Sequence, residues 1–141
     1  GGYMVAWMNG HVKADRYRAY VCHAGCFDWR GMFAGDAWRW HSKELGATYW
    51  VDPAKVQAQS PDAFVAGMKT PTLVVHGALD YRVPDAQGLA YYNTLKELGV
   101  DARLVWFPDE NHWILKPRNS KLWYAELFAW LRTHDPVARK S

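Results

Sequence analysis

Asp80 and His112 are residues of the types that general acid–base chemistry needs. Asp80 lies in the segment HGALDYRVP, and His112 lies in PDENHW. A carboxylate beside an imidazole can accept the Nδ1–H, fix the tautomer of the ring and stabilise the imidazolium that forms when the histidine takes a proton. Either residue alone would ordinarily belong to a turn or a loop. The pair is informative because each residue follows a predicted strand.

The segments around the pair predict a strand, a helix and a second strand. Residues 72–76 (TLVVH) form a compact, β-branched apolar run that is typical of a buried strand, and residues 102–107 (ARLVWF) predict another strand. Between them, residues 85–98 carry apolar side chains at helical spacing. Such a unit is parallel and right-handed, so both strand ends meet at one edge of the sheet. We therefore expect Asp80 and His112 to lie within or close to hydrogen-bond distance.

The rest of the chain extends this pattern into an α/β fold with parallel strands and crossover helices. Three further helical segments are predicted: one at 2–9 that stops at Asn9-Gly10, one at 60–68 that Ser60 begins, and an amphipathic helix at 119–131. A further strand is predicted at 17–22. The long aromatic segment at 23–40 and the polar segment at 108–116 are predicted to be loops.

Composition limits the classes of protein that fit. The chain has 141 residues, of which 50% are hydrophobic, so it has the size and the apolar content of one domain with a buried core. Its net charge is only +3, and the basic residues are scattered among acids, which argues against a nucleic-acid partner. No apolar run approaches the about 20 residues of a membrane span, so no membrane partner is expected.

The two cysteines, Cys22 and Cys26, leave three interpretations open. They stand four apart in VCHAGC, and no second pair completes a zinc site. They are small buried residues at a strand end, or they form a disulfide that an extended segment would strain. A cysteine nucleophile is the third interpretation, although AGCFD lacks the second glycine of a nucleophile elbow.

Three segments together resemble the prolyl oligopeptidase family of serine peptidases. They are GGYM at the start, TPTLVVHGALDYRVPDAQ in the middle and FPDENHWILKPRNSKLW near the end. The resemblance covers nearly the whole chain and is strongest to the dipeptidyl-peptidase and acylaminoacyl-peptidase branches. It implies an α/β-hydrolase fold, in which the Asp of HGxxD (Asp80) is the triad acid and the His of PxExH (His112) is the triad base. It implies no metal and no organic cofactor.

The nucleophile of that family has no counterpart in this chain. The family serine lies in GxSxGGY, and the chain begins at GGY, so the matching serine would stand two positions before Gly1. None of the serines present has the sequence context of a nucleophile elbow: Ser42, Ser60, Ser120 and Ser141. We expect residues 1–141 to be the C-terminal portion of an α/β-hydrolase peptidase domain, truncated just after the serine and inactive by itself.

The resemblance also implies a pocket for the substrate side chain before the scissile bond, the P1 residue. Trp29 and Met32 fall in the loop that lines this pocket in related peptidases, and Val83 lies close to the acid. Aromatic and small apolar walls suit an uncharged P1 residue. Trp29 is equally well explained as a core residue. Arg82 is expected to pair either with a neighbouring acid or with a substrate carbonyl.

The implied reaction is hydrolysis of short peptide substrates by a Ser–Asp–His triad. A carboxylesterase or lipase-like hydrolase is the nearest alternative, because a triad does not choose between ester and amide. A non-catalytic fragment is an alternative of another class. In each case we expect pairing with the missing N-terminal part of the enzyme, or self-association, to cover a bare strand edge and the apolar helix faces that carry Met4, Trp7, Trp123 and Trp130. The sequence assigns neither the P1 preference nor the compartment.

Overall fold

A three-stranded parallel sheet forms the centre of the molecule. The computed structural model describes residues 1–135 and 137. The strands β1 (Tyr20–His23), β2 (Thr72–Gly77) and β3 (Ala102–Phe107) are hydrogen-bonded in the order β1-β2-β3. The predicted α/β pattern of parallel strands with crossover helices is therefore confirmed.

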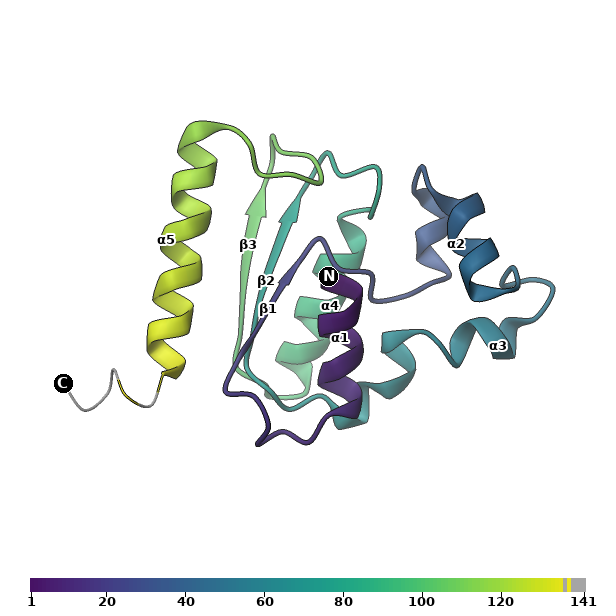
Figure 1. Cartoon of the computed structure of the whole chain (residues 1–141), viewed down its shortest axis with the longest axis horizontal. Coiled ribbons are helices and arrows are strands. Elements are labelled where there is room, and N and C mark those ends of the chain that lie inside the picture. The colour runs from purple at the N-terminus through teal and green to yellow at the C-terminus, as the bar shows by residue number, and fades with distance from the viewer. Residues whose placement is uncertain (136, 138–141) are drawn as a thin grey trace.

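Helices cover both faces of this sheet, which gives three layers (Figure 1). Helix α5 (Pro117–His134) packs on one face, while α1 (Gly2–His11) and α4 (Ala86–Glu97) pack on the other. Every residue of β2 is buried, as expected for the central strand of a parallel sheet. Alternate residues of β2 face opposite layers, so Leu73 packs with Trp130 of α5 and Val74 packs with Tyr91 of α4.

Helix α1 does not stop at Asn9-Gly10, so that prediction is wrong. The helix continues to His11, because the Asn9 side chain is buried and bonds to helix α4 and to the loop before β2 instead of ending the helix. Its Nδ2 donates to the hydroxyl of Tyr91 at 2.8 Å, and its Oδ1 accepts from the backbone N–H of Thr70 at 3.2 Å. Gly10 allows close packing, since a Cβ there would lie 2.9 Å from the Cβ of Phe64.

The connection between β1 and β2 is more helical than predicted. The strand is shifted to Tyr20–His23, and the predicted loop at 23–40 contains the 3₁₀ helix η1 (Gly31–Ala34) and the start of α2 (Trp38–Leu45). A short helix α3 (Pro53–Gln57) and the 3₁₀ helix η2 (Pro61–Gly67) follow. Ser60 does not cap η2 with its side chain; its Oγ accepts instead from the backbone N–H of Trp29 at 3.0 Å.

Helix α5 packs on its face of the sheet through Trp123 and Trp130, which were expected to lie uncovered. Trp130 is only 7% exposed, and its Nε1–H donates to the carbonyl of Tyr20 at 3.1 Å. Trp123 is half-buried on the same side, whereas Met4 of α1 is exposed as predicted. The outer face of α5 carries other exposed apolar residues, Leu122, Tyr124, Phe128 and Leu131. In the part of the chain that the structure describes, no helix is both long and apolar enough to cross a bilayer.

Candidate active site

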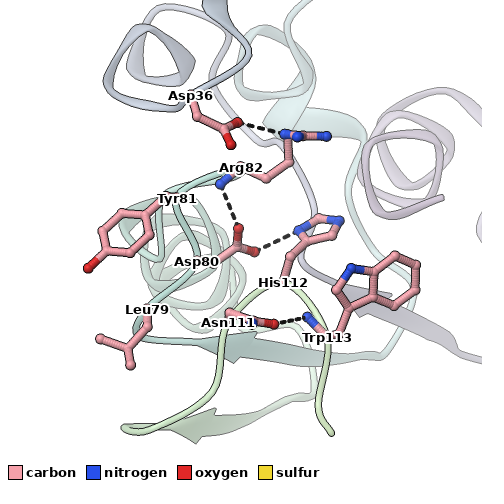
Figure 2. A pocket seen from close by; sticks show the side chains of 8 residues that line it. All are labelled: Asp36, Leu79, Asp80, Tyr81, Arg82, Asn111, His112 and Trp113. Atoms are coloured by element: carbon pink, nitrogen blue, oxygen red, sulfur yellow. Dashed lines mark hydrogen bonds and ion pairs between the residues drawn. The ribbon is translucent and has the colours of Figure 1, made fainter.

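Asp80 and His112 meet at the carboxyl-terminal edge of the sheet. Asp80 lies in the turn after β2, and His112 lies in the loop after β3. The Nδ1 of His112 is 2.8 Å from Oδ2 of Asp80, and the ring and the carboxylate face each other directly (Figure 2). The expected hydrogen-bond distance is confirmed. The parallel β2–α4–β3 unit produces it, because it brings two consecutive strand ends to one edge.

The surroundings of Asp80 keep its carboxylate ionised. Its Oδ1 accepts from the backbone N–H groups of Arg82 and Val83, each at 2.9 Å, and the residue is only 3% exposed. Burial by itself raises the pKa of Asp80, but hydrogen bonds from His76, Val83 and His112 outweigh it and hold the pKa below its ordinary value. A buried, ionised carboxylate can fix the tautomer of His112 and stabilise its protonated form.

His76, at the end of β2, holds the turn that carries Asp80. The residue is fully buried, and its Nε2 lies 2.8 Å from the carbonyl oxygen of Val83 and 3.4 Å from Oδ2 of Asp80. A carbonyl only accepts hydrogen bonds, so Nε2 carries the proton. The Nδ1 on the other side of the ring has no partner among the described residues. It packs on Gly88, and a Cβ added to Gly88 would lie 2.5 Å from this nitrogen.

Glu110 organises the loop that carries His112. Its buried carboxylate accepts from the backbone N–H groups of Leu115 at 3.1 Å and Lys116 at 2.9 Å, and from Nδ2 of Asn119 at 2.8 Å. Burial raises the pKa of Glu110, but these hydrogen bonds outweigh it and lower the pKa overall. The sequence analysis missed this residue, although an acid two positions before His112 in a polar loop was a signal for it.

A cavity of about 410 Å³ opens beside His112. All three residues predicted for a P1 pocket, Trp29, Met32 and Val83, line it. Trp29 also packs against the buried cluster of Cys26, Met32 and Val83, so it is both a wall and part of the core. The sequence analysis missed other lining residues from separate elements, among them Tyr3, His23, Cys26, Trp40 and His41.

Arg82 pairs with a neighbouring acid, which is one of the two arrangements expected for it. Its Nε donates to Oδ1 of Asp36 at 2.6 Å, and both side chains are 53% exposed (Figure 2). The pair ties the η1–α2 loop to the turn that carries Asp80, since the backbone N–H of Asp36 also donates to the carbonyl of Tyr81 at 2.7 Å. The contacts of Asp36 therefore hold in place both the turn that carries Asp80 and Arg82, which lines the cavity.

Comparisons with known proteins agree with this arrangement. The model of the prolyl oligopeptidase family matches residues 1–135. The chain belongs to the prolyl oligopeptidase family. Among curated members of that family of peptidases, dipeptidyl-peptidase 5 of Schizosaccharomyces pombe is 38% identical over 132 residues, which are 93% of this chain and 19% of the relative. Probable dipeptidyl-peptidase 5 of Aspergillus terreus is 34% identical over 139 residues, which are 97% of this chain and 19% of the relative.

Solved structures of two peptidases share the fold. The acylaminoacyl peptidase of Pyrococcus horikoshii superposes with a TM-score of 0.85 and 25% identity, over 94% of this chain and 22% of that one. Dipeptidyl peptidase 4 of Porphyromonas gingivalis, at 16% identity and a TM-score of 0.82, shows the same fold over 95% of this chain and 18% of that one. The predicted α/β-hydrolase architecture is therefore confirmed. The chain spans about a fifth of the length of the curated relatives it matches, 19% in each case.

The cysteines of this prolyl oligopeptidase chain are buried free thiols. Burial raises the pKa of Cys22 to about 12 and raises the pKa of Cys26 as well. A thiol with a raised pKa is a poor nucleophile at neutral pH. Of the three interpretations left open by the sequence, small buried residues at the strand end describe both cysteines.

The serines of the described residues have structural surroundings. Ser42 Oγ donates to the carbonyl of Trp38 at 2.8 Å, and Ser60 is buried against Trp29. Ser120 lies in the first turn of α5, and Ser141 lies outside the described residues. Within residues 1–135 and 137, no group of three or more His, Cys, Asp or Glu side chains is placed to hold a metal ion.

Proposed function

We propose that this chain supplies the acid and the base of a Ser–Asp–His triad in a serine peptidase that cleaves short peptides. The observation that carries the proposal is the 2.8 Å contact between Asp80 and His112 at the strand ends. The family match and the dipeptidyl-peptidase 5 relatives support the reaction type. In this proposal, residues 1–141 are the C-terminal portion of the hydrolase domain, and the nucleophilic serine lies outside them.

The proposed mechanism uses both nitrogens of His112. Nδ1 donates to Asp80, which leaves Nε2 to act as the base. Nε2 takes the proton of the serine hydroxyl as its oxygen attacks the scissile carbonyl, and it then gives that proton to the leaving amine. The side chain of His112 is 34% exposed and lines the cavity beside it, so a reacting group can reach it. Asp80 stabilises the imidazolium between the two transfers.

The proposed substrate site is the 410 Å³ cavity beside His112. Trp29, Met32 and Val83 would contact the P1 side chain there, next to the histidine that acts on the scissile bond. These three side chains give the cavity an aromatic and apolar part, while polar groups elsewhere in its lining can orient a bound group. Contact with the apolar part favours an uncharged P1 residue.

The proposed partner segment pairs with β1. Among the described residues, β1 is hydrogen-bonded on one side only, to β2, and its outer edge is unpaired. An open edge of a parallel strand is a template for a further strand. In this proposal the preceding part of the same enzyme fills that edge, or a second copy of the chain does.

Labelling with a fluorophosphonate probe tests this function. The full-length protein that contains the chain is expected to be labelled and to hydrolyse dipeptide anilides. Residues 1–141 alone are expected to do neither, because none of the serines has the sequence context of a nucleophile elbow. Stoichiometric labelling of the isolated chain at any of its four serines would overturn the assignment of the nucleophile.

Two further measurements separate the alternatives. His112→Ala in the full-length protein is expected to abolish turnover without unfolding the domain and with only a modest fall in the unfolding midpoint, because the side chain is 34% exposed and the hydrogen bond that it loses is the one to Asp80. A large loss of stability would point to a structural histidine instead. Parallel assays with short-chain acyl esters distinguish a peptidase from an esterase, since the latter would cleave only the esters. Absence of both activities in the full-length protein would leave the non-catalytic alternative.

A further inference from the structure

His41 is a buried histidine in the wall of the cavity beside His112. It lies in α2, it is only 5% exposed, and it lines the cavity. Its ring packs edge-on against Trp29, with centroids 5.2 Å apart, and against Trp40 at 5.3 Å. Among the described residues, the ring has no hydrogen-bond partner. A buried polar side chain without a partner calls for an explanation, because unmade hydrogen bonds are costly in protein interiors.

The environment of the ring identifies which nitrogen carries the proton. Burial lowers the pKa of His41, and the charge of Arg82 lowers it further against the opposing effect of Asp36, so the imidazole is neutral near pH 7. Nδ1 is enclosed without a partner, whereas Nε2 is not enclosed in this way. Orphaned buried N–H groups are rarer than unpaired acceptors. The proton therefore belongs on Nε2, and the bare lone pair on Nδ1.

Two neighbouring polar groups of the same wall have already used their single donors. The hydroxyl of Tyr3 donates to the carbonyl of Gln59 at 2.9 Å, and Nε1 of Trp29 donates to the same oxygen at 2.8 Å. Nε of Arg82 donates to Asp36 at 2.6 Å, and the other guanidinium N–H groups belong to a side chain that is 53% exposed. His41 differs from these residues, because its ring is buried against Trp29 and Trp40 and its Nε2–H has no partner among the described residues, so that it remains available to a molecule that enters the cavity.

We propose that His41 determines specificity at this cavity by donating its Nε2–H to a hydrogen-bond acceptor on the P1 side chain. The inference rests on the proposed function, in which the cavity receives that side chain. A volume of about 410 Å³ with tryptophan walls accommodates an aromatic ring. A phenol oxygen supplies the acceptor, so tyrosine fits the cavity and its donor together. Phenylalanine would displace water from the N–H without replacing its hydrogen bond.

The decisive comparison uses two matched substrates that differ only in a P1 tyrosine or phenylalanine. For the full-length protein we expect kcat/KM to favour tyrosine about tenfold, the effect of one neutral hydrogen bond. His41→Phe keeps an aromatic ring and removes the donor, so the ratio should fall to about one. His41→Gln keeps an amide N–H and should retain part of the preference. His11→Phe, on the exposed end of α1, is a control that should leave the ratio unchanged.

Equal or better cleavage of the phenylalanine substrate by the unmodified protein would overturn the inference. A tyrosine preference that survives in a cooperatively unfolding His41→Phe variant would also overturn it. If neither substrate is cleaved, the proposed function fails, but the inference remains testable. Calorimetric binding of N-acetyl-tyrosinamide and N-acetyl-phenylalaninamide then decides it, since the donor predicts tighter binding of the first compound and equal binding of both refutes it.

Discussion

Gly77, the last residue of β2, lies directly against the carbonyl oxygen of Asn111 in the loop that carries His112. A Cβ on Gly77 would overlap that oxygen and would come within 2.5 Å of the carbonyl oxygen of Glu110. Two backbone hydrogen bonds hold the two loops together where they pass each other. The N–H of Ala78 donates to the carbonyl of Phe107 at 2.8 Å, and the N–H of Leu79 donates to the carbonyl of Glu110 at 2.9 Å. The loops of the acid and the base are therefore joined backbone to backbone, which sets the distance between their side chains.

Gly77→Ala is expected to push the His112 loop away from the Asp80 turn. Because the obstructing atoms belong to the backbone, the variant should lose about 1–3 kcal/mol of unfolding free energy and most of kcat. Chemical denaturation and steady-state kinetics measure the two effects. Gly99→Ala is the control, since nothing lies within 4 Å of its Cβ position but its φ is +71°. It should cost about 1 kcal/mol and leave kcat unchanged. Equal kcat losses in both variants would show that the contact between Gly77 and the His112 loop does not specifically control catalysis.

Asp80→Asn tests whether the carboxylate orients and stabilises His112. The amide oxygen can still accept the N–H groups of Arg82 and Val83, so the turn should remain intact. Its NH₂ group would face Nδ1 of His112 and favour the wrong tautomer. We expect kcat to fall about 10⁴-fold with little change in KM. A fall of less than tenfold in a folded variant would show that Asp80 is structural only.

The stability of the protein should depend on pH through Asp80. Its pKa in the folded protein lies below the ordinary value of 3.8, so ionised Asp80 favours folding above that pH. This contribution is lost as the pH falls through the folded pKa. The difference in unfolding free energy between the unmodified protein and Asp80→Asn should therefore shrink as the pH falls from about 5 to about 2, as measured by urea denaturation. Asp109 and Glu110 also have lowered pKa values, but they are common to both proteins. A pH-independent difference would contradict the assignment.

Glu110→Gln should loosen the loop that presents His112. One amide oxygen replaces a carboxylate that accepts three hydrogen bonds, and the new NH₂ group opposes either the backbone N–H of Leu115, at the Oε2 position, or the donors of Lys116 and Asn119, at the Oε1 position. We expect a loss of about 1–3 kcal/mol of stability and a lower kcat at nearly constant KM. Asp109→Asn is the matched control, because Asp109 is exposed and bonds only to side chains of the same loop region. Its kcat should be unchanged; a similar fall in both variants would remove the special role of Glu110.

The sequence by itself determined the β2–α4–β3 unit and the proximity of Asp80 and His112. Apolar runs and helical spacing are local signals, and the handedness of a parallel crossover then leaves one arrangement of the two strand ends. The family resemblance, rather than this reasoning, implied that Trp29, Met32 and Val83 line one pocket. All of these depend on the order of residues along short segments.

Only the tertiary structure decided which polar residues are buried and what they contact. Asn9 has the local signature of a helix end, but Tyr91 and Thr70, which are distant in the sequence, bind it, and α1 continues. Nothing near His41 in the chain indicates that it is buried, and nothing near Gly77 indicates the loop that packs against it; the position of Glu110 in a polar loop marks it as a candidate but does not show which backbone groups it binds. Each role depends on atoms brought together from distant segments. The free energy that fixes such residues comes from packing and desolvation in three dimensions, which no local pattern encodes.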